Sequence, residues 1–180
     1  MLGDIPRKLL MFLLITMCSI AFVVVVGGVV WAVKRARKNN ESNSVKVIVL
    51  TLASMIIAAA SWIFNFGWIR FFMTLLAIPI IHGLVYFAAN LVFAKYTNDS
   101  AKMRKLNGFF IVTYLISYLF FPDGGDVGEM YFFFTLIRND ILSGIAYFVS
   151  SVAFIGHIVL FVMQIVQIIK IKRNKTENGL

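Results

Sequence analysis

Two histidines stand in the middle of long apolar runs, where an ionisable side chain is unusual. His82 lies thirteen residues before Lys95, and His157 lies thirteen residues before Lys170. At 1.5 Å per helical residue, both imidazoles are expected about 20 Å from these basic residues, and therefore at one depth in a membrane. An ionisable group inside a membrane marks a candidate functional site.

Further polar residues share the helices that are expected to carry the two histidines. Ser143, Ser150, His157 and Gln164 recur every seven residues, so on a helix they form one stripe. Such residues can hold helices together by hydrogen bonds, or they can surround a solute or an ion. We use the name polar seam for six of them: His82, Tyr86, Asn90, Ser150, His157 and Gln164.

Two imidazoles at one depth are compatible with several kinds of chemistry. They could be the axial ligands of a b-type haem, a proton relay, or part of a solute site. The simplest alternative is that each neutral imidazole hydrogen-bonds a neighbouring helix. Haem propionates usually need basic partners, and Arg70 is the only one nearby in the sequence. The sequence therefore favours helix packing and predicts no resident cofactor.

An acidic, glycine-rich loop is a second place where chemistry could occur. Asp123, Asp126 and Glu129 follow one another at three-residue spacing within the segment 122–140. Their carboxylates could bind Ca²⁺ or Mg²⁺, which prefer oxygen ligands, although the spacing is not that of an EF-hand. The alternative, which we favour, is a solvated turn.

The composition indicates what kind of structure positions these residues. Hydrophobic residues make up 61% of the 180 residues and charged residues 14%, whereas a soluble domain has about 25% charged residues. Several apolar runs are long enough to cross a hydrocarbon core of roughly 30 Å. Since backbone groups in lipid must be paired internally, these runs are expected to be helices. The sequence predicts one all-α domain, a polytopic membrane helix bundle.

Five transmembrane helices are expected, and the run 9–33 is too long for the apolar region of a cleaved signal peptide, which has about 7–15 residues. Pro79 is expected to kink the third span. The apolar stretch 131–137 is half the length of a span and is expected to form a short interfacial or re-entrant helix in the last outer loop. The predicted spans are 9–33, 47–66, 69–94, 106–121 and 141–169.

The distribution of positive charge predicts the orientation of the chain. Thirteen of the seventeen Lys and Arg residues fall within 34–46, 95–105 and 170–180. Each of these segments adjoins an apolar run, which is typical of cytoplasmic flanks rather than of nucleic-acid binding. We expect a bacterial cytoplasmic membrane, with the N-terminus outside, the acidic loop 122–140 outside, and the C-terminus in the cytoplasm.

One expected span shows a clear packing face. Small and polar residues recur along 47–66 at alternating spacings of three and four, so they share one side of a helix. Small residues and hydroxyls are typical of helix contacts in membranes. The residues of this expected helix-packing face are Thr51, Ser54, Ala58, Ser61 and Asn65.

Enzyme signatures are missing from the sequence. It contains no HExxH, G-x-S-x-G or P-loop motif, and no Asp or Glu lies within the five expected spans. We therefore predict a non-enzymatic subunit, regulator or protective factor of a membrane system, in contact with the lipid bilayer and with another membrane protein or a second copy of the chain. The alternatives are a small solute or ion transporter or channel that uses the polar seam, and a haem-bearing electron-transfer subunit with His82 and His157 as ligands.

Overall fold

A computed structural model describes most of the chain. The described residues are 42–124, 129–177, and positions 16, 20, 23, 26–28, 30, 31, 34, 35 and 38. Most of the expected span 9–33, and Asp126 of the acidic loop, therefore lie outside the described residues.

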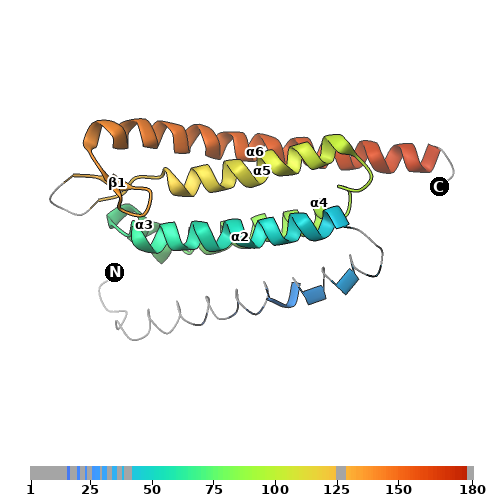
Figure 1. Ribbon diagram of the computed structural model, residues 1–180, viewed down its shortest axis with the longest axis horizontal. Coiled ribbons are helices and arrows are strands. Elements are labelled where there is room, and N and C mark those ends of the chain that lie inside the picture. The colour runs from blue at the N-terminus through green and yellow to red at the C-terminus, as the bar shows by residue number, and fades with distance from the viewer. Residues whose placement is uncertain are drawn as a thin grey trace, which may run out of the picture.

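The described part is mostly helical. Figure 1 shows four long helices running side by side along the long axis, with α6 extending beyond the others at its C-terminal end. The chain folds into α2 (Ser42–Phe64), α3 (Trp68–Leu75), α4 (Ile78–Ala94), α5 (Ala101–Leu119), β1 (Tyr131–Phe132), β2 (Ile137–Arg138) and α6 (Asp140–Glu177).

Two of the described helices, α2 and α6, are long and apolar enough to cross a membrane. The pair α3 and α4 also qualifies if the two are taken together, which makes up to three such spans among the described residues. With 38 residues, α6 is about 57 Å long. It is therefore much longer than a hydrocarbon core of roughly 30 Å, and its last turns carry the basic residues of 170–175.

The expected span 69–94 is not one continuous helix, because the chain breaks between Leu75 and Ile78 and bends there by 68°; α3 and α4 qualify as a span only when they are taken together. Ala77 adopts a left-handed backbone with φ of 57°. Pro79 does not kink the helix but lies in the first turn of α4, where a missing backbone N–H leaves no hydrogen bond unmade.

The short interfacial or re-entrant helix predicted over 131–137 is wrong, because this segment forms two strands and the turn between them. The strands β1 and β2 form a small antiparallel hairpin with Tyr131 opposite Arg138, and Asp123 bridges to Tyr131 on the other side. Three consecutive residues at the tip have left-handed φ angles between 50° and 62°: Phe133, Phe134 and Thr135. A segment of seven residues is too short for periodicity to separate strand from helix, and aromatic residues favour strands.

The core lies where α2, α4 and α6 pack around α5. Large aromatic side chains dominate it, among them Tyr86, Phe93, Phe110 and Tyr114. The five residues of the expected helix-packing face are all buried, four of them on α2 and Asn65 directly after its end. Near the N-terminus, Gly28 approaches α4 so closely that an added Cβ would lie 2.8 Å from the Phe87 ring.

The left-handed Ala77 gives a test of the helix break. Left-handed backbone costs an alanine roughly 1–2 kcal/mol that glycine does not pay. We expect Ala77→Gly to raise the free energy of unfolding by about 0.5–1 kcal/mol, measured by thermal unfolding in detergent.

The matched control is Ala53→Gly, at an exposed position inside α2. This substitution should lower the free energy of unfolding by about 0.5–1 kcal/mol, because glycine weakens a regular helix. Destabilisation by both substitutions would contradict a break at Ala77.

Candidate functional site

The two histidines of the polar seam are in direct contact. His82 comes from α4 and His157 from α6, and their ring centroids lie 5.4 Å apart with the rings nearly perpendicular, at 88°. His157 also stacks on Phe110 of α5, with a centroid distance of 3.9 Å and an angle of 9°. The bundle thus brings three helices together at one level around the imidazoles.

Each imidazole has a hydrogen-bond partner. His82 Nδ1 lies 2.9 Å from the Tyr118 hydroxyl. His157 Nδ1 lies 3.1 Å from the Phe110 carbonyl oxygen, so this nitrogen carries the proton and donates it. A haem between the two imidazoles would need the space of a macrocycle, whereas the rings touch, so this hypothesis requires α4 and α6 to move apart.

Tyr86 connects the polar seam to the packing face of α2. Its ring stacks on Tyr114 with a centroid distance of 3.7 Å and an angle of 2°. Its hydroxyl lies 2.7 Å from Ser54 Oγ. Because Ser54 donates its own proton to the Thr51 carbonyl, the Tyr86 hydroxyl is the donor. The face expected from small residues on α2 therefore meets the polar seam through a hydrogen bond.

The six residues of the polar seam include none from α5, although α5 lies at its centre. Phe110, Tyr114 and Tyr118 are four residues apart and share one face of α5, and all three contact an imidazole. This four-residue spacing of aromatic residues is the feature of the sequence that indicates a contribution of α5 to the site. It is weaker than a run of polar residues, because aromatic residues at helical spacing usually indicate a core.

Three buried amides lie between His157 and the C-terminal end of α6 along the bundle: Asn90, Asn107 and Gln164. Asn90 donates to the Tyr86 carbonyl at 2.9 Å, and Asn107 donates to Asn90 Oδ1 at 3.0 Å. Gln164 is fully buried, and neither of its polar atoms has a partner among the described residues; Asn107 Oδ1 also has none there. The helices α5 and α6 run antiparallel. Gln164 and Asn107 therefore lie at a similar level, between the contact of His157 with Thr113 and the contact of Lys175 with Asp99.

The serines of the α6 stripe bond locally. Ser150 Oγ donates to the Tyr147 carbonyl of its own helix at 3.0 Å. Ser143 Oγ donates to the Met130 carbonyl at 3.2 Å and so fixes the loop before β1. The four members of the stripe therefore have different environments, and Gln164 alone lacks a partner in the described part of the chain.

Asp123 caps helix α3. Its carboxylate accepts hydrogen bonds from the backbone N–H groups of Gly67, Ile69 and Arg70 at 3.1, 3.2 and 2.7 Å. The N–H of Trp68 donates to the Gly124 carbonyl at 3.1 Å. The first N–H groups of α3, which have no partner within the helix, are thus all bonded. A carboxylate is also favoured at a helix N-terminus by the helix dipole.

This geometry bears on the predicted metal site of the acidic loop. Asp123 directs its oxygens to backbone N–H groups, and Asp126 lies outside the described residues. Within the described ranges, no group of three His, Cys, Asp or Glu side chains is arranged to hold a metal ion. The metal hypothesis for Asp123, Asp126 and Glu129 stays a prediction.

Arg70 lies at the same end of the bundle as Asp123 and is fully buried. Its guanidinium donates to the carbonyls of Ser61 near the end of α2, and of Tyr118 and Phe121 at the end of α5. It also lies over the Trp62 ring, with its Cζ 4.9 Å from the centroid. A cation is favoured where helix C-termini meet, because their carbonyls carry partial negative charge.

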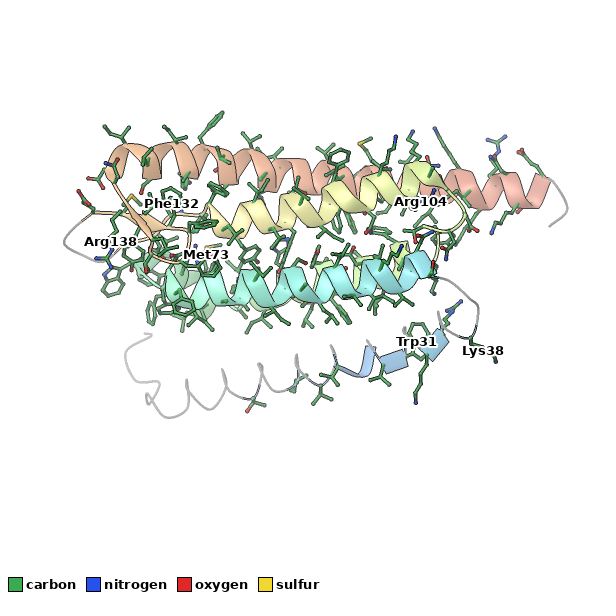
Figure 2. The ribbon with its side chains drawn as sticks, viewed as in Figure 1. Trp31, Lys38, Met73, Arg104, Phe132 and Arg138 are labelled. Carbon is green, nitrogen blue, oxygen red and sulfur yellow. The ribbon has the colours of Figure 1, made fainter. Side chains whose placement is uncertain are left out.

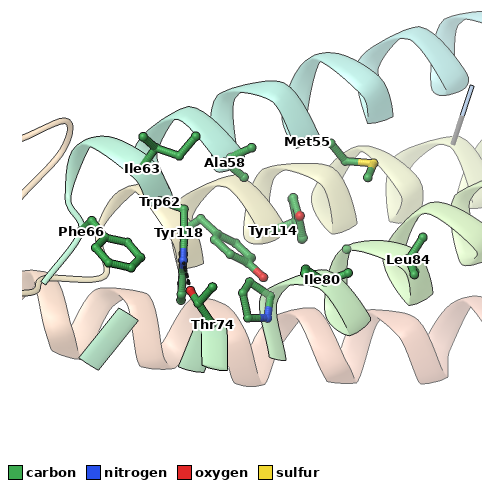
Figure 3. Close-up of a pocket in the computed structure, with 13 residues that line it drawn as sticks. Met55, Ala58, Trp62, Ile63, Phe66, Thr74, Ile80, Leu84, Tyr114 and Tyr118 are labelled. Carbon is green, nitrogen blue, oxygen red and sulfur yellow. Dashed lines mark hydrogen bonds between the residues drawn. The ribbon is translucent and has the colours of Figure 1, made fainter. Parts of the chain in front are cut away.

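Two clefts flank the N-terminal half of α4, and Trp62, Pro79 and Tyr118 line both. The α2–α4 cleft has a volume of about 540 Å³ and includes Met55, Ile63 and Leu84. Figure 3 shows this cleft, with the hydrogen bond from Trp62 Nε1 to Thr74 Oγ1 at 2.9 Å. The α4–α6 cleft has a volume of about 530 Å³ and includes His82, Ser150 and Phe154.

Comparison with protein-family models, with curated proteins and with solved structures finds no match to this chain. Its function is therefore inferred from its own geometry.

The capping of α3 gives a test of how this end of the bundle is held together. Asp123→Ala leaves several buried N–H groups without an acceptor, so we expect the free energy of unfolding to fall by about 2 kcal/mol. The matched control is Asp99→Ala, which removes a surface ion pair with Lys175 and should cost less than about 1 kcal/mol. Equal losses, measured by thermal unfolding in detergent, would contradict the capping role.

Proposed function

We propose that this chain is a five-span protein of a bacterial cytoplasmic membrane and acts as a non-enzymatic subunit, regulator or protective factor of a larger membrane system. The observation that carries the proposal is the state of the polar seam. His82, His157 and Tyr86 bond to and stack on the chain's own helices. Groups used in this way support a packing role rather than a catalytic one.

The distribution of charged residues supports the proposed orientation. Figure 2 shows Arg104 and Lys38 at one end of the bundle and Arg138 at the opposite end. Lys170, Lys172, Arg173 and Lys175 belong to the extension of α6 at the first of these ends. An excess of Lys and Arg at one end is typical of the cytoplasmic side, and the hairpin of β1 and β2 is then outside.

The surface of the helices supports a position in lipid. Large apolar side chains are exposed along α2 and α6, among them Ile63, Phe148 and Ile155. Soluble monomers rarely expose apolar patches larger than a few hundred Å². In the proposed topology, these side chains contact lipid tails or another membrane protein.

A small transporter or channel is the second candidate function, and one observation favours it. Gln164 and Asn107 present buried amide atoms that have no partner among the described residues. Such atoms could line a path for an ion or a small polar solute.

The orientation can be tested with single cysteines. Cys18, the one cysteine of the sequence, is first replaced by serine, and a cysteine is then introduced at Leu136 in the hairpin or at Lys102 in α5, both exposed. We expect a membrane-impermeant maleimide to label Leu136→Cys on intact cells. Lys102→Cys should be labelled only after the cells are lysed. The reverse pattern would show that the orientation is wrong.

The role as a subunit or regulator can be tested in native membranes. A photo-crosslinking side chain at Phe148 on α6 or Ile63 on α2, which are 69% and 70% exposed, should give a discrete adduct with one membrane protein or a second copy of this chain. The control is Ala146, which is 2% exposed and should give none. Adducts with lipid alone would contradict this role.

A flux measurement separates the two candidate functions. Liposomes that contain this chain alone should leak Na⁺, K⁺ and protons no faster than empty liposomes. Flux that is present with the wild-type chain and is lost in Gln164→Leu would favour the transporter or channel.

A further inference from the structure

The α4–α6 cleft has the features of a small-molecule site. Of the candidate functions, the subunit or regulator role does not need this cleft, and the transporter shares only His82 and Ser150 with it. The cleft's volume of about 530 Å³ lies in the usual range for ligand sites of about 300–1,000 Å³. Its rim includes Ile81, Val85 and Ile155, which are 56%, 52% and 62% exposed. The cleft thus opens sideways from the bundle, and in the membrane topology proposed above, on which this inference rests, it opens toward lipid.

One hydrogen-bond donor of the cleft is free. His82 lines the cleft, and its Nδ1 is engaged with the Tyr118 hydroxyl at 2.9 Å. A phenol is the better proton donor and an imidazole nitrogen the better acceptor, so Tyr118 donates and His82 carries its own proton on Nε2. No hydrogen bond from another described residue reaches this Nε2.

The hydroxyls of the cleft offer oxygen atoms but not protons. Ser117 donates to the Tyr114 carbonyl, and both Ser150 and Ser151 donate to the Tyr147 carbonyl. The Nε2–H of His82 therefore remains as the donor available to a ligand in the described part of this cleft. A ligand that matches it carries a hydrogen-bond acceptor, such as a carbonyl oxygen.

Aromatic rings form much of the wall. The ring of His82 stacks with Tyr118 at a centroid distance of 5.7 Å and meets the edge of Phe154 at 5.5 Å, and Trp62 and Phe121 also line the cleft. Aromatic side chains pack favourably against planar rings. The shape and chemistry therefore fit a flat ring better than a saturated chain.

The depth of His82 narrows the choice of ligand. It lies thirteen residues from Lys95, and therefore about 20 Å from the cytoplasmic boundary. In a hydrocarbon core of roughly 30 Å, this leaves about 10 Å to the outer boundary. The ester carbonyls of bilayer lipids lie at the boundary and do not reach this depth, whereas the ring carbonyl of a membrane-soluble quinone does.

We propose that the α4–α6 cleft binds the ring of an isoprenoid quinone. One ring carbonyl accepts a hydrogen bond from His82 Nε2, the ring packs among Trp62, Tyr118 and Phe154, and the tail leaves between α4 and α6 into the lipid. The proposal is one of binding and includes no electron transfer.

The test uses the intrinsic fluorescence of Trp62. Trp31→Phe and Trp68→Phe leave Trp62 as the one tryptophan of the full-length chain, and the protein in detergent is titrated with a benzoquinone that carries a ten-carbon tail. We expect saturable quenching. Loss of one hydrogen bond, as in His82→Leu, should weaken the affinity about tenfold. His82→Gln, whose amide can still donate, should stay within about threefold of the parent.

Two controls separate this site from general affinity for apolar chains. An alkylbenzene with the same tail but no carbonyl should bind about tenfold more weakly than the quinone and should not respond to His82→Leu. Ile155→Phe, made in the same single-tryptophan chain, narrows the mouth of the cleft without adding a fluorophore and should abolish saturable quenching by the quinone. Equal binding of the two compounds, or non-saturable quenching, would overturn the proposal.

The outcome is distinguishable from a failure of the proposed function. Quenching in detergent does not depend on topology, whereas cysteine labelling on cells does. Quenching that fails in a chain with the expected labelling pattern would overturn the quinone site alone. A reversed labelling pattern would overturn the topology and the depth argument together.

Discussion

The structure depends on how the chain satisfies helix ends that lie inside the bundle. A helix leaves its first four N–H groups and its last four carbonyls without internal partners, and in lipid no water can take their place. The break between α3 and α4 adds further ends of this kind. Asp123 and Gly124 bond the N–H groups that begin α3, and Arg70 bonds carbonyls that end α2 and α5. Two buried charged side chains thus satisfy unpaired backbone groups: Asp123 accepts from N–H groups at a helix N-terminus, and Arg70 donates to carbonyls at helix C-termini.

This arrangement also determines where the clefts form. The chain bends by 68° between α3 and α4, so α3 does not continue in the direction of α4. The two clefts lie beside the first turns of α4. Trp62, Pro79 and Tyr118 line both clefts. The hairpin is tied to the same region, since Thr135 donates its N–H to Asn65 Oδ1 at 2.6 Å. The hairpin, the break between α3 and α4 and the two clefts therefore lie together in one region of the bundle.

The sequence allowed a mostly helical fold to be predicted, because apolar runs such as those of α2 and α6 have few other solutions in lipid. It also indicated that His82 and His157 lie at one depth, because each is thirteen residues from a basic residue, Lys95 or Lys170, at the end of its helix. It indicated a kink at Pro79 but not a full break at Ala77, because the left-handed residue itself is neither glycine nor asparagine. Nor could it show the role of Asp123, whose partners at Gly67 and Arg70 are more than fifty residues away. A carboxylate near glycines resembles a metal ligand until these N–H groups are seen.

Packing explains most of the polar stripe on α6, but not its last member. Ser143 and Ser150 donate to nearby carbonyls, and His157 donates across to α5. Gln164 has no such partner in the described chain, and a buried amide without one costs about 1–3 kcal/mol. A leucine would pack against α5 without this cost. Gln164 is therefore the position at which the polar stripe exceeds what helix packing requires.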